Sequence, residues 1–291
     1  MESPESRTAR YLARYDLRLD DVSQLIRPVG PAETLLLVGS VPEGLANEES
    51  DLDLILIGEG VLEDGLVLTI EEFENSTVRL PSGLDLNCEL LRPAALRATA
   101  SRFAPTFDAI RQPESVSQIL LATDHELRTL HRLRSGVALA NPKVAEAWRQ
   151  ELRLDELPGY VVLFALAHHL EYREDAIAQA KLGDARTAVL MLRLSMDYLA
   201  FALLGSVDET NQHPKWRVRL LERQRAVLGD DVVERCIAAL FPKPQDDPRG
   251  ATQEAIAFAD AVIQGILERH PELLKASLEL NQRFQFTTHT G

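Results

Sequence analysis

Short runs of aliphatic residues, each bounded by glycine, proline or polar residues, form the pattern of the first ninety positions. Runs of this length and composition are typical of buried β-strands. We predict strands at residues 34–38, 52–57, 66–70, 77–80 and 84–91. The Pro-Ser-Gly sequence at 81–83 predicts a turn that joins the last two strands as a hairpin.

A helical period replaces the strand pattern from residue 93 onward, where apolar residues recur three or four positions apart. Two short helices are also expected within residues 4–28. The later predicted helices are 93–104, 116–134, 160–182, 185–204, 215–228, 231–240, 253–269 and 272–284. The predicted fold class is α+β: a small mixed β-sheet core with flanking helices, followed by an all-α helical bundle. We place the domains at 1–125 and 126–291.

The composition agrees with two folded domains. A chain of 291 residues suits two domains of ordinary size, and 45% hydrophobic with 26% charged residues is an ordinary globular balance. No uncharged apolar run approaches the roughly 18–20 residues of a membrane span, and residues 1–18 lack the apolar core of a secretory signal. Two cysteines, Cys88 and Cys236, are too few for a disulfide framework or a zinc cluster. We therefore expect a cytoplasmic protein with no membrane partner.

Negative charge is concentrated in the first hundred residues, which hold 19 acidic residues, 8 arginines and no lysine, a net charge of −11. The whole chain carries −14. Because a protein that binds long nucleic acid by its backbone normally presents a basic stripe, we do not expect a long nucleic-acid partner. A region this acidic is either a solvated surface or a place that holds cations, and the second interpretation needs a motif.

Such a motif follows the first predicted strand: Gly39-Ser40, a spacer of ten residues, and then Asp51 and Asp53. Carboxylates at positions i and i+2 of a strand point to the same face, where their charges repel unless a cation lies between them. Mg²⁺ suits such a pair, because it binds carboxylate oxygens together with phosphate oxygens and water. The glycine lets the backbone approach a triphosphate, and the Ser40 hydroxyl is able to donate to a phosphate oxygen.

The segment 38–58, VGSVPEGLANEESDLDLILIG, resembles the signature of the nucleotidyltransferase superfamily whose best-known member is DNA polymerase beta. It is most similar to the minimal and aminoglycoside-modifying types, which carry a helical C-terminal domain. The resemblance implies a catalytic domain at 1–125 and a helical substrate-binding domain at 126–291. It also implies that Gly39 and Ser40 hold the nucleotide phosphates and that Asp51 and Asp53 bind Mg²⁺, which Mn²⁺ would replace.

The superfamily adds a third carboxylate on a neighbouring strand, and residues 84–90, LDLNCEL, offer two candidates. With a period of two, Asp85, Asn87 and Glu89 share one face of this strand. We prefer Asp85 as a catalytic residue and metal ligand, because its surroundings resemble the corresponding strand of the kanamycin nucleotidyltransferase type. The spacing leaves Glu89 open. In such enzymes the third acid accepts a proton from the acceptor hydroxyl or completes a second metal site.

Weaker signals lie on later helices. The segment LHRLRSG at 130–136 resembles the helix that follows the catalytic core in several minimal nucleotidyltransferases, so His131 or Arg132 could reach a phosphate. The purely structural interpretation of this segment is a helix end with a glycine cap. Lys215, beside Trp216, is a candidate nucleotide contact, since lysine meets phosphates and tryptophan stacks on bases. The alternative is a tryptophan that anchors a loop on the bundle.

A histidine pair, His168 and His169, lies in the middle of a predicted helix. Adjacent helical residues point in different directions, so at most one of the two could face a site, and helix packing is the simpler role. The helical domain resembles the HEPN-like bundles that accompany such cores. HEPN ribonucleases carry an arginine, then four to six intervening residues, then a histidine, and residues 185–204 lack this motif, so we expect no ribonuclease activity.

These observations predict a Mg²⁺-dependent nucleotidyltransferase that moves a nucleoside monophosphate, AMP from ATP in the first instance, onto a hydroxyl group with release of pyrophosphate. A small-molecule acceptor is preferred, and the acidic first domain would suit a cationic one. Two alternatives stay open: an antitoxin-like enzyme that transfers AMP to proteins, and a catalytically inactive nucleotide-binding regulator. A homodimer is compatible with the sequence.

Overall fold

The computed structural model describes residues 3–22, 29–59, 66–70, 73–80, 82–111, 121–241 and 248–274. The chain forms two compact units, each made of two chain segments. One unit combines Met1–Ala104 with Thr123–Asp155, and the other combines Pro105–Ala122 with Glu156–Gly291. The structure thus divides the chain differently from the predicted boundary at 125/126, because the chain beyond that boundary still belongs to the first unit and completes its sheet.

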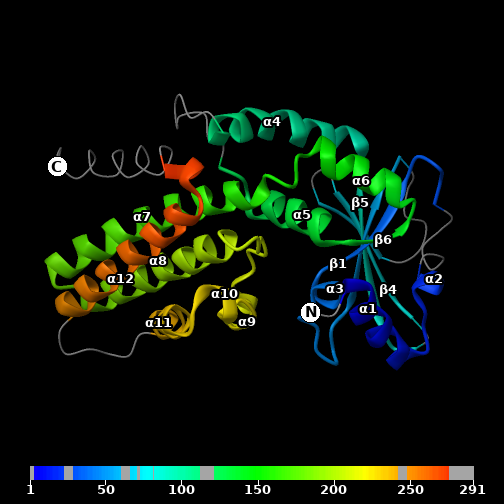
Figure 1. The fold of residues 1–291 in the computed structure, drawn as a ribbon. Coiled ribbons are helices and arrows are strands. Elements are labelled where there is room, and N and C mark those ends of the chain that lie inside the picture. The colour runs from blue at the N-terminus through cyan, green and yellow to red at the C-terminus, as the bar shows by residue number, and fades with distance from the viewer. Residues whose placement is uncertain are drawn as a thin grey trace. The chain divides into compact units, whose positions relative to one another are not determined.

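The first unit contains, within the described residues, a sheet of six strands. They are β1 (Thr34–Val38), β2 (Leu52–Ile57), β3 (Leu66–Ile70), β4 (Phe73–Arg79), β5 (Asp85–Leu91) and β6 (Val137–Ala140). The strand order is β3-β4-β5-β2-β1-β6, with β2 parallel to β5 and every other neighbouring pair antiparallel. The predicted class, α+β with a small mixed sheet and a helical region after it, is confirmed (Figure 1).

The alternation of side chains fixes which face of this sheet is apolar. Leu54 of β2 and Cys88 of β5 lie in the core cluster with Tyr11 and Leu12 from the N-terminal helix. Residues one position away point to the opposite face, and in β2 only Asp53 is not buried. A register slip of one residue would expose the leucines, each of which contributes about 1.5–3 kcal/mol when buried. The register therefore holds Asp53, Asn87 and Glu89 on one common face.

Helices cover the first unit on both faces. They are α1 (Pro4–Leu12), the 3-10 turn η1 (Ala13–Tyr15), α2 (Leu19–Val22), α3 (Ser40–Glu43), α5 (Asp124–Ser135) and α6 (Pro142–Glu151). α4 (Pro93–Arg111) runs from the first unit into the second. α5 begins with a capping box, in which the Thr123 and Glu126 side chains each accept from the other's backbone N–H. It ends at Gly136, where a Cβ would lie only 2.9 Å from Val38 Cγ1, so the helix end packs tightly on β1.

All secondary-structure elements described in the second unit are helices. Its elements are α7 (Leu157–Leu182), α8 (Ala185–Gly205), η3 (Pro214–Trp216), α9 (Arg217–Arg223), α10 (Arg225–Leu228), α11 (Asp230–Leu240), α12 (Pro248–Arg269) and η4 (Pro271–Leu273). α8 packs against α7, α11 and α12. By length and composition alone α8 is apolar enough to cross a membrane, but 61% of its apolar stretch is buried inside the unit, as in the core helix of a bundle.

Most of the predicted elements are present in the structure. The helices α3 and α6 were not predicted, and α4 and α12 extend beyond their predicted ranges of 93–104 and 253–269. β4 begins at Phe73, four residues before its predicted start, and β6 was not expected at all. The predicted helix at 116–134 is described only from residue 121, and its observed helix is α5. Parts of three predicted helices, at 23–28, 116–120 and 275–284, lie outside the described residues.

Candidate active site

The structure brings the two predicted metal ligands together through an asparagine. Asp53 lies in β2 between Val38 of β1 and Asn87 of β5, and Asp51 directly precedes β2. The Asn87 amide Nδ2 donates to Asp51 Oδ2 at 3.0 Å, and the same amide, opposite Asp53 in the strand register, lowers the pKa of the Asp53 carboxyl. The Thr77 hydroxyl donates to Asn87 Oδ1 at 2.9 Å, which turns the NH₂ group toward the carboxylates. One oriented amide therefore holds Asp51 and lies beside Asp53.

The glycine of the motif lies against Asp53. Gly39 has a φ of +76°, and a Cβ placed there would come within 2.4 Å of Asp53 Oδ2. Only glycine permits this approach. Ser40 follows as the first residue of α3, and its carbonyl accepts from the backbone N–H groups of Leu45 and Ala46 at 2.8 and 3.0 Å. The predicted phosphate loop is thus a tight turn in direct contact with the predicted metal ligand.

The two candidates for the third carboxylate have different surroundings. Asp85 begins β5, its side chain is 40% exposed, and its Oδ1 pairs with Arg79 Nε at 3.7 Å. Glu89 is 9% exposed, and its Oε2 lies 3.4 Å from Arg132 Nη1. The same guanidinium reaches Asp53, with Nη2 3.6 Å from Oδ2. The structure therefore links Glu89 rather than Asp85, the preferred candidate, to Asp53.

Glu89 also has an unusual oxygen. Its Oε1 is buried and has no hydrogen-bond partner within the described parts of the chain. The His125 ring nitrogen Nε2 approaches this oxygen at 3.6 Å, beyond hydrogen-bond distance. A buried carboxylate oxygen without a hydrogen bond is costly, so it is ready to accept a proton or to bind a cation.

The charge balance at Asp53 favours a cation. Burial raises the pKa of Asp53 above its ordinary value, the Arg132 guanidinium opposes this shift, and the charge of Asp51 adds to it. The ionised carboxylate therefore lies in surroundings that Arg132 compensates only in part. A divalent cation would stabilise the ionised form of both aspartates.

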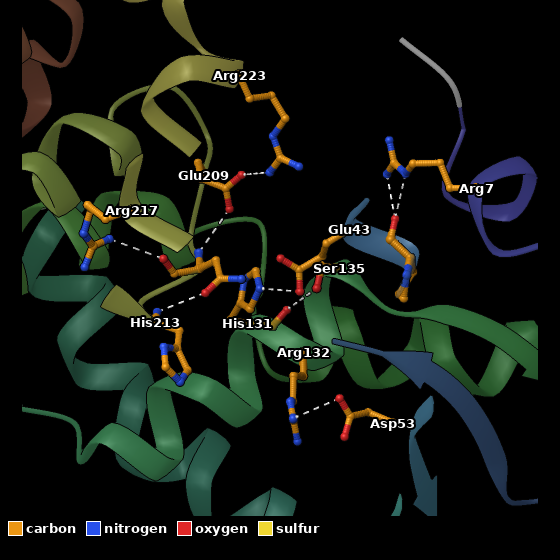
Figure 2. A network of polar contacts seen from close by, with 12 residues as sticks. Arg7, Glu43, Asp53, His131, Arg132, Ser135, Glu209, His213, Arg217 and Arg223 are labelled. Atoms are coloured by element: carbon orange, nitrogen blue, oxygen red, sulfur yellow. Dashed lines mark hydrogen bonds and ion pairs between the residues drawn. The ribbon is translucent and has the colours of Figure 1, made fainter. Parts of the chain in front are cut away.

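Two contacts fix the turn that carries Ser40 (Figure 2). Nε2 of His131 on α5 lies 3.1 Å from Oε1 of Glu43, the last residue of α3, and both side chains are buried. From the other side, Arg7 of α1 donates to the Pro42 carbonyl from Nε at 3.0 Å and from Nη2 at 2.7 Å. Three residues of the site were not identified from the sequence as functional: Asn87, Glu43 and His125. Of these, only Asn87 had a sequence feature that could have indicated a role, namely its position between two acidic residues.

The remaining predicted residues lie in the helical unit. Lys215 is on η3, with Nζ 4.7 Å from the centre of the Trp216 ring. Its assignment to a nucleotide stays a prediction. His169 is fully buried, and its Nδ1 lies 2.9 Å from the Ser195 hydroxyl and 3.0 Å from the Ser195 carbonyl, in keeping with a packing role. His168 stacks on Tyr198 with ring centres 4.8 Å apart.

Whether a metal ion fits this site depends on which side chains are available as ligands. Across the described ranges, no three His, Cys, Asp or Glu side chains are gathered closely enough to form a metal site made of protein ligands alone. Mg²⁺ does not need such a cage, since it is typically held by one or two carboxylates, with phosphate oxygens and waters supplying the rest. The linked pair Asp51 and Asp53, next to the Gly39 turn, fits that mode of binding.

Comparisons with known proteins add little to this picture. No family model matches the sequence, and no curated protein matches it. Among solved structures, the chain is similar to the crystal structure of a nucleotidyltransferase-like protein from Exiguobacterium sibiricum, with 16% sequence identity and a TM-score of 0.43. The similarity covers 93% of this chain and 78% of the other. A likeness of this degree does not establish a shared activity.

Proposed function

We propose that the chain is a Mg²⁺-dependent nucleotidyltransferase, which moves AMP from ATP, or the monophosphate of another nucleoside triphosphate, onto a hydroxyl of a small acceptor. One observation carries the proposal. The Gly39 turn lies against a carboxylate, Asp53, and the Asn87 amide opposite Asp53 donates to a second carboxylate, Asp51. A phosphate-binding turn next to a pair of metal-binding acids is the arrangement that transfer of a nucleotide requires.

In this proposal each residue has a separate task. Asp51 and Asp53 would hold Mg²⁺, which when bound neutralises the negative charge of the triphosphate. The Asn87 amide keeps the Asp51 carboxylate in place beside Asp53. The Ser40 hydroxyl donates to a phosphate oxygen, and the glycine before it leaves room for the phosphates.

The chemical step needs a proton acceptor. The acceptor oxygen bonds to the α-phosphorus, the bond from that phosphorus to the bridging oxygen breaks, and pyrophosphate leaves. The proton of the acceptor hydroxyl goes to a carboxylate, for which the buried Oε1 of Glu89 is better suited than the exposed Asp85.

Arg132 has one role in the metal-free site and another once Mg²⁺ is bound. Without a metal it is the cation beside Asp53 and Glu89. Once Mg²⁺ occupies the aspartates, like charges repel, and the guanidinium is better placed on a phosphate oxygen, which it matches in shape.

The test is release of pyrophosphate from ATP and Mg²⁺ in the presence of a panel of hydroxyl-bearing acceptors, cationic ones included. We expect Asp53→Asn to lose more than the roughly 10- to 100-fold that removal of an outer-shell partner costs. Asp85→Asn is the matched control, because it also neutralises an acid of this sheet and should keep most of the activity. Equal activity of Asp53→Asn and the wild type would contradict the proposal.

A catalytically inactive nucleotide-binding regulator is the second candidate, and the ion pair between Arg132 and Asp53 favours it, since the charge of the aspartate is already partly compensated. ATP binding without pyrophosphate release for any acceptor would support this candidate. Transfer of labelled AMP to added proteins, but to no small molecule, would support an antitoxin-like enzyme.

A further inference from the structure

Three arginines share one face at the N-terminal end of the first unit. Arg7, Arg10 and Arg14 are spaced three and four residues apart, which places them side by side along α1 and η1. With Tyr11 they line a cavity of about 140 Å³, whose other wall comes from α3 and the residues after it: Val41, Gly44 and Ala46.

The positive charge of this cavity stands out from its surroundings. The first hundred residues carry a net charge of −11, and no lysine or arginine occurs from residue 28 to residue 78. Three of the eight arginines in this region nevertheless line one small cavity. A small cavity with three guanidinium side chains on its wall favours an anionic ligand over a neutral or cationic one.

Direct contacts hold the frame of the cavity together. Arg7 binds the Pro42 carbonyl, and its side chain lies so close to Gly44 that a Cβ there would come within 2.8 Å of Arg7 Cδ. The Tyr11 hydroxyl donates to the Ser50 carbonyl. Arg10 and Arg14 are exposed, and the Arg14 guanidinium lies 5.7 Å from the centre of the Tyr11 ring. Two guanidinium groups are therefore accessible at the edge of a fixed wall.

We propose that this cavity binds a phosphate group of a small free anion. The guanidinium fork matches phosphate oxygens and forms strong, charge-assisted hydrogen bonds with them. The volume of about 140 Å³ is well below the roughly 300–1,000 Å³ of pockets that enclose a whole drug-sized ligand. The cavity therefore takes an inorganic phosphate or one end of a polyphosphate. Its wall is the segment that follows Gly39 and Ser40, so the anion would contact the back of the candidate phosphate loop.

The binding test uses the full chain in metal-free buffer, with isothermal titration calorimetry against inorganic triphosphate. We expect the wild type to bind and the double variant Arg10→Gln/Arg14→Gln to bind about 10-fold more weakly or worse, because two charge-assisted contacts are lost. Arg18→Gln is the matched control, an exposed arginine of the same segment that does not line the cavity, and it should keep its affinity. Thermal unfolding of each variant checks that the fold is intact.

A further variant separates this site from the candidate active site. In the metal-free buffer Arg132 is paired with Asp53 and Glu89, so Arg132→Gln should leave triphosphate binding unchanged if the anion sits on α1, although the same variant is expected to weaken ATP binding when Mg²⁺ is present. Loss of binding in Arg132→Gln but not in the double variant would place the anion at the carboxylates and overturn the inference. Absence of binding by the wild type would overturn it as well. So would tight binding of single-stranded RNA through Arg10 and Arg14 with no binding of free triphosphate.

Discussion

Asn87 occupies the place in the candidate site where two like charges meet. Its NH₂ group points toward Asp51 and Asp53 because the Thr77 hydroxyl donates to the other end of the amide. Polar residues such as Asn87 and Thr77 are common in strands, and neither identifies a functional site by itself. The motif of Gly39, Ser40 and the two aspartates could be recognised from sequence because it is contiguous and because its spacing implies a shared face. The position of Asn87 between two acids was visible in the sequence, but its contact with Asp51 was not, because that contact depends on which strands become neighbours.

Gly39 gives a prediction at this scale. Gly39→Ala should destabilise the fold, because the Gly39 backbone (φ +76°, ψ −152°) lies in a region that costs an L-residue on the order of 1–3 kcal/mol, and the new Cβ would also clash with Asp53 Oδ2. It should weaken Mg²⁺ binding too, since the carboxylate must move. The matched control is Gly83→Ala, which has a φ of +86° with nothing within 4 Å of the added Cβ.

Chemical denaturation and Mg²⁺ titration check this pair. Gly83→Ala should lose stability alone, and Gly39→Ala should lose both stability and metal affinity. Unchanged metal binding in Gly39→Ala would show that the contact between the turn and Asp53 does not matter for the site.

At the scale of elements, long periodic helices were predictable and short sheet additions were not. α7 and α8 begin and end within a few residues of their predicted limits, because apolar residues repeat through them and Gly183 separates them. β6 is only four residues, Val-Ala-Leu-Ala, set between Gly136 and Asn141. Its strand state comes from pairing with β1, a tertiary contact that outweighs its weak local preference. The chain segment that contains β6 also contains α5, whose Arg132 lies beside the acids of β2 and β5.

Arg132 on α5 gives the prediction at this scale. Arg132→Ala should raise the affinity for Mg²⁺ in the absence of nucleotide, because the competing cation beside Asp53 is gone. It should also raise the KM for ATP roughly 10-fold, as a charge-assisted contact to phosphate is lost. Arg79→Ala is the control, since Arg79 pairs with the exposed Asp85 instead.

Calorimetry with the metal alone and initial-rate kinetics measure the two effects. Weaker metal binding in Arg132→Ala would mean that the arginine holds the carboxylates in place rather than competing with the metal.

At the scale of the whole molecule, the acidic residues make the stability of the fold depend on pH. The chain carries −14, and its first unit keeps buried or half-buried acids close together on the sheet. An acid that is harder to ionise in the folded chain than in the unfolded chain lowers stability as the pH rises. Asp53 is such a group, since burial raises its pKa in the fold from an ordinary 3.8.

The sign of this effect leads to a prediction about overall stability. The folded chain holds the Asp53 proton to a higher pH than the unfolded chain, so the free energy of unfolding contributed by this group falls as pH rises from 3.8 through the raised pKa. Asp53→Asn should therefore unfold at a higher temperature than the wild type at pH 7. The difference should shrink as the pH falls toward 3.8.

Thermal unfolding followed by circular dichroism, with and without Mg²⁺, checks this prediction. Mg²⁺ should stabilise the wild type and leave Asp53→Asn unchanged. A variant less stable than the wild type at pH 7 would contradict the assigned burial effect.

The first unit is assembled from two stretches of chain, and this has a consequence for synthesis on the ribosome. The strand that covers the outer edge of β1, and the helix that brings Arg132, belong to residues 123–155. A nascent chain that has released residues 1–104 therefore presents an unpaired β1 edge and an uncompensated carboxylate pair until about fifty more residues have emerged. During that interval the growing polypeptide is open to aggregation through this edge, so a chaperone or an early metal ion would have its greatest effect there.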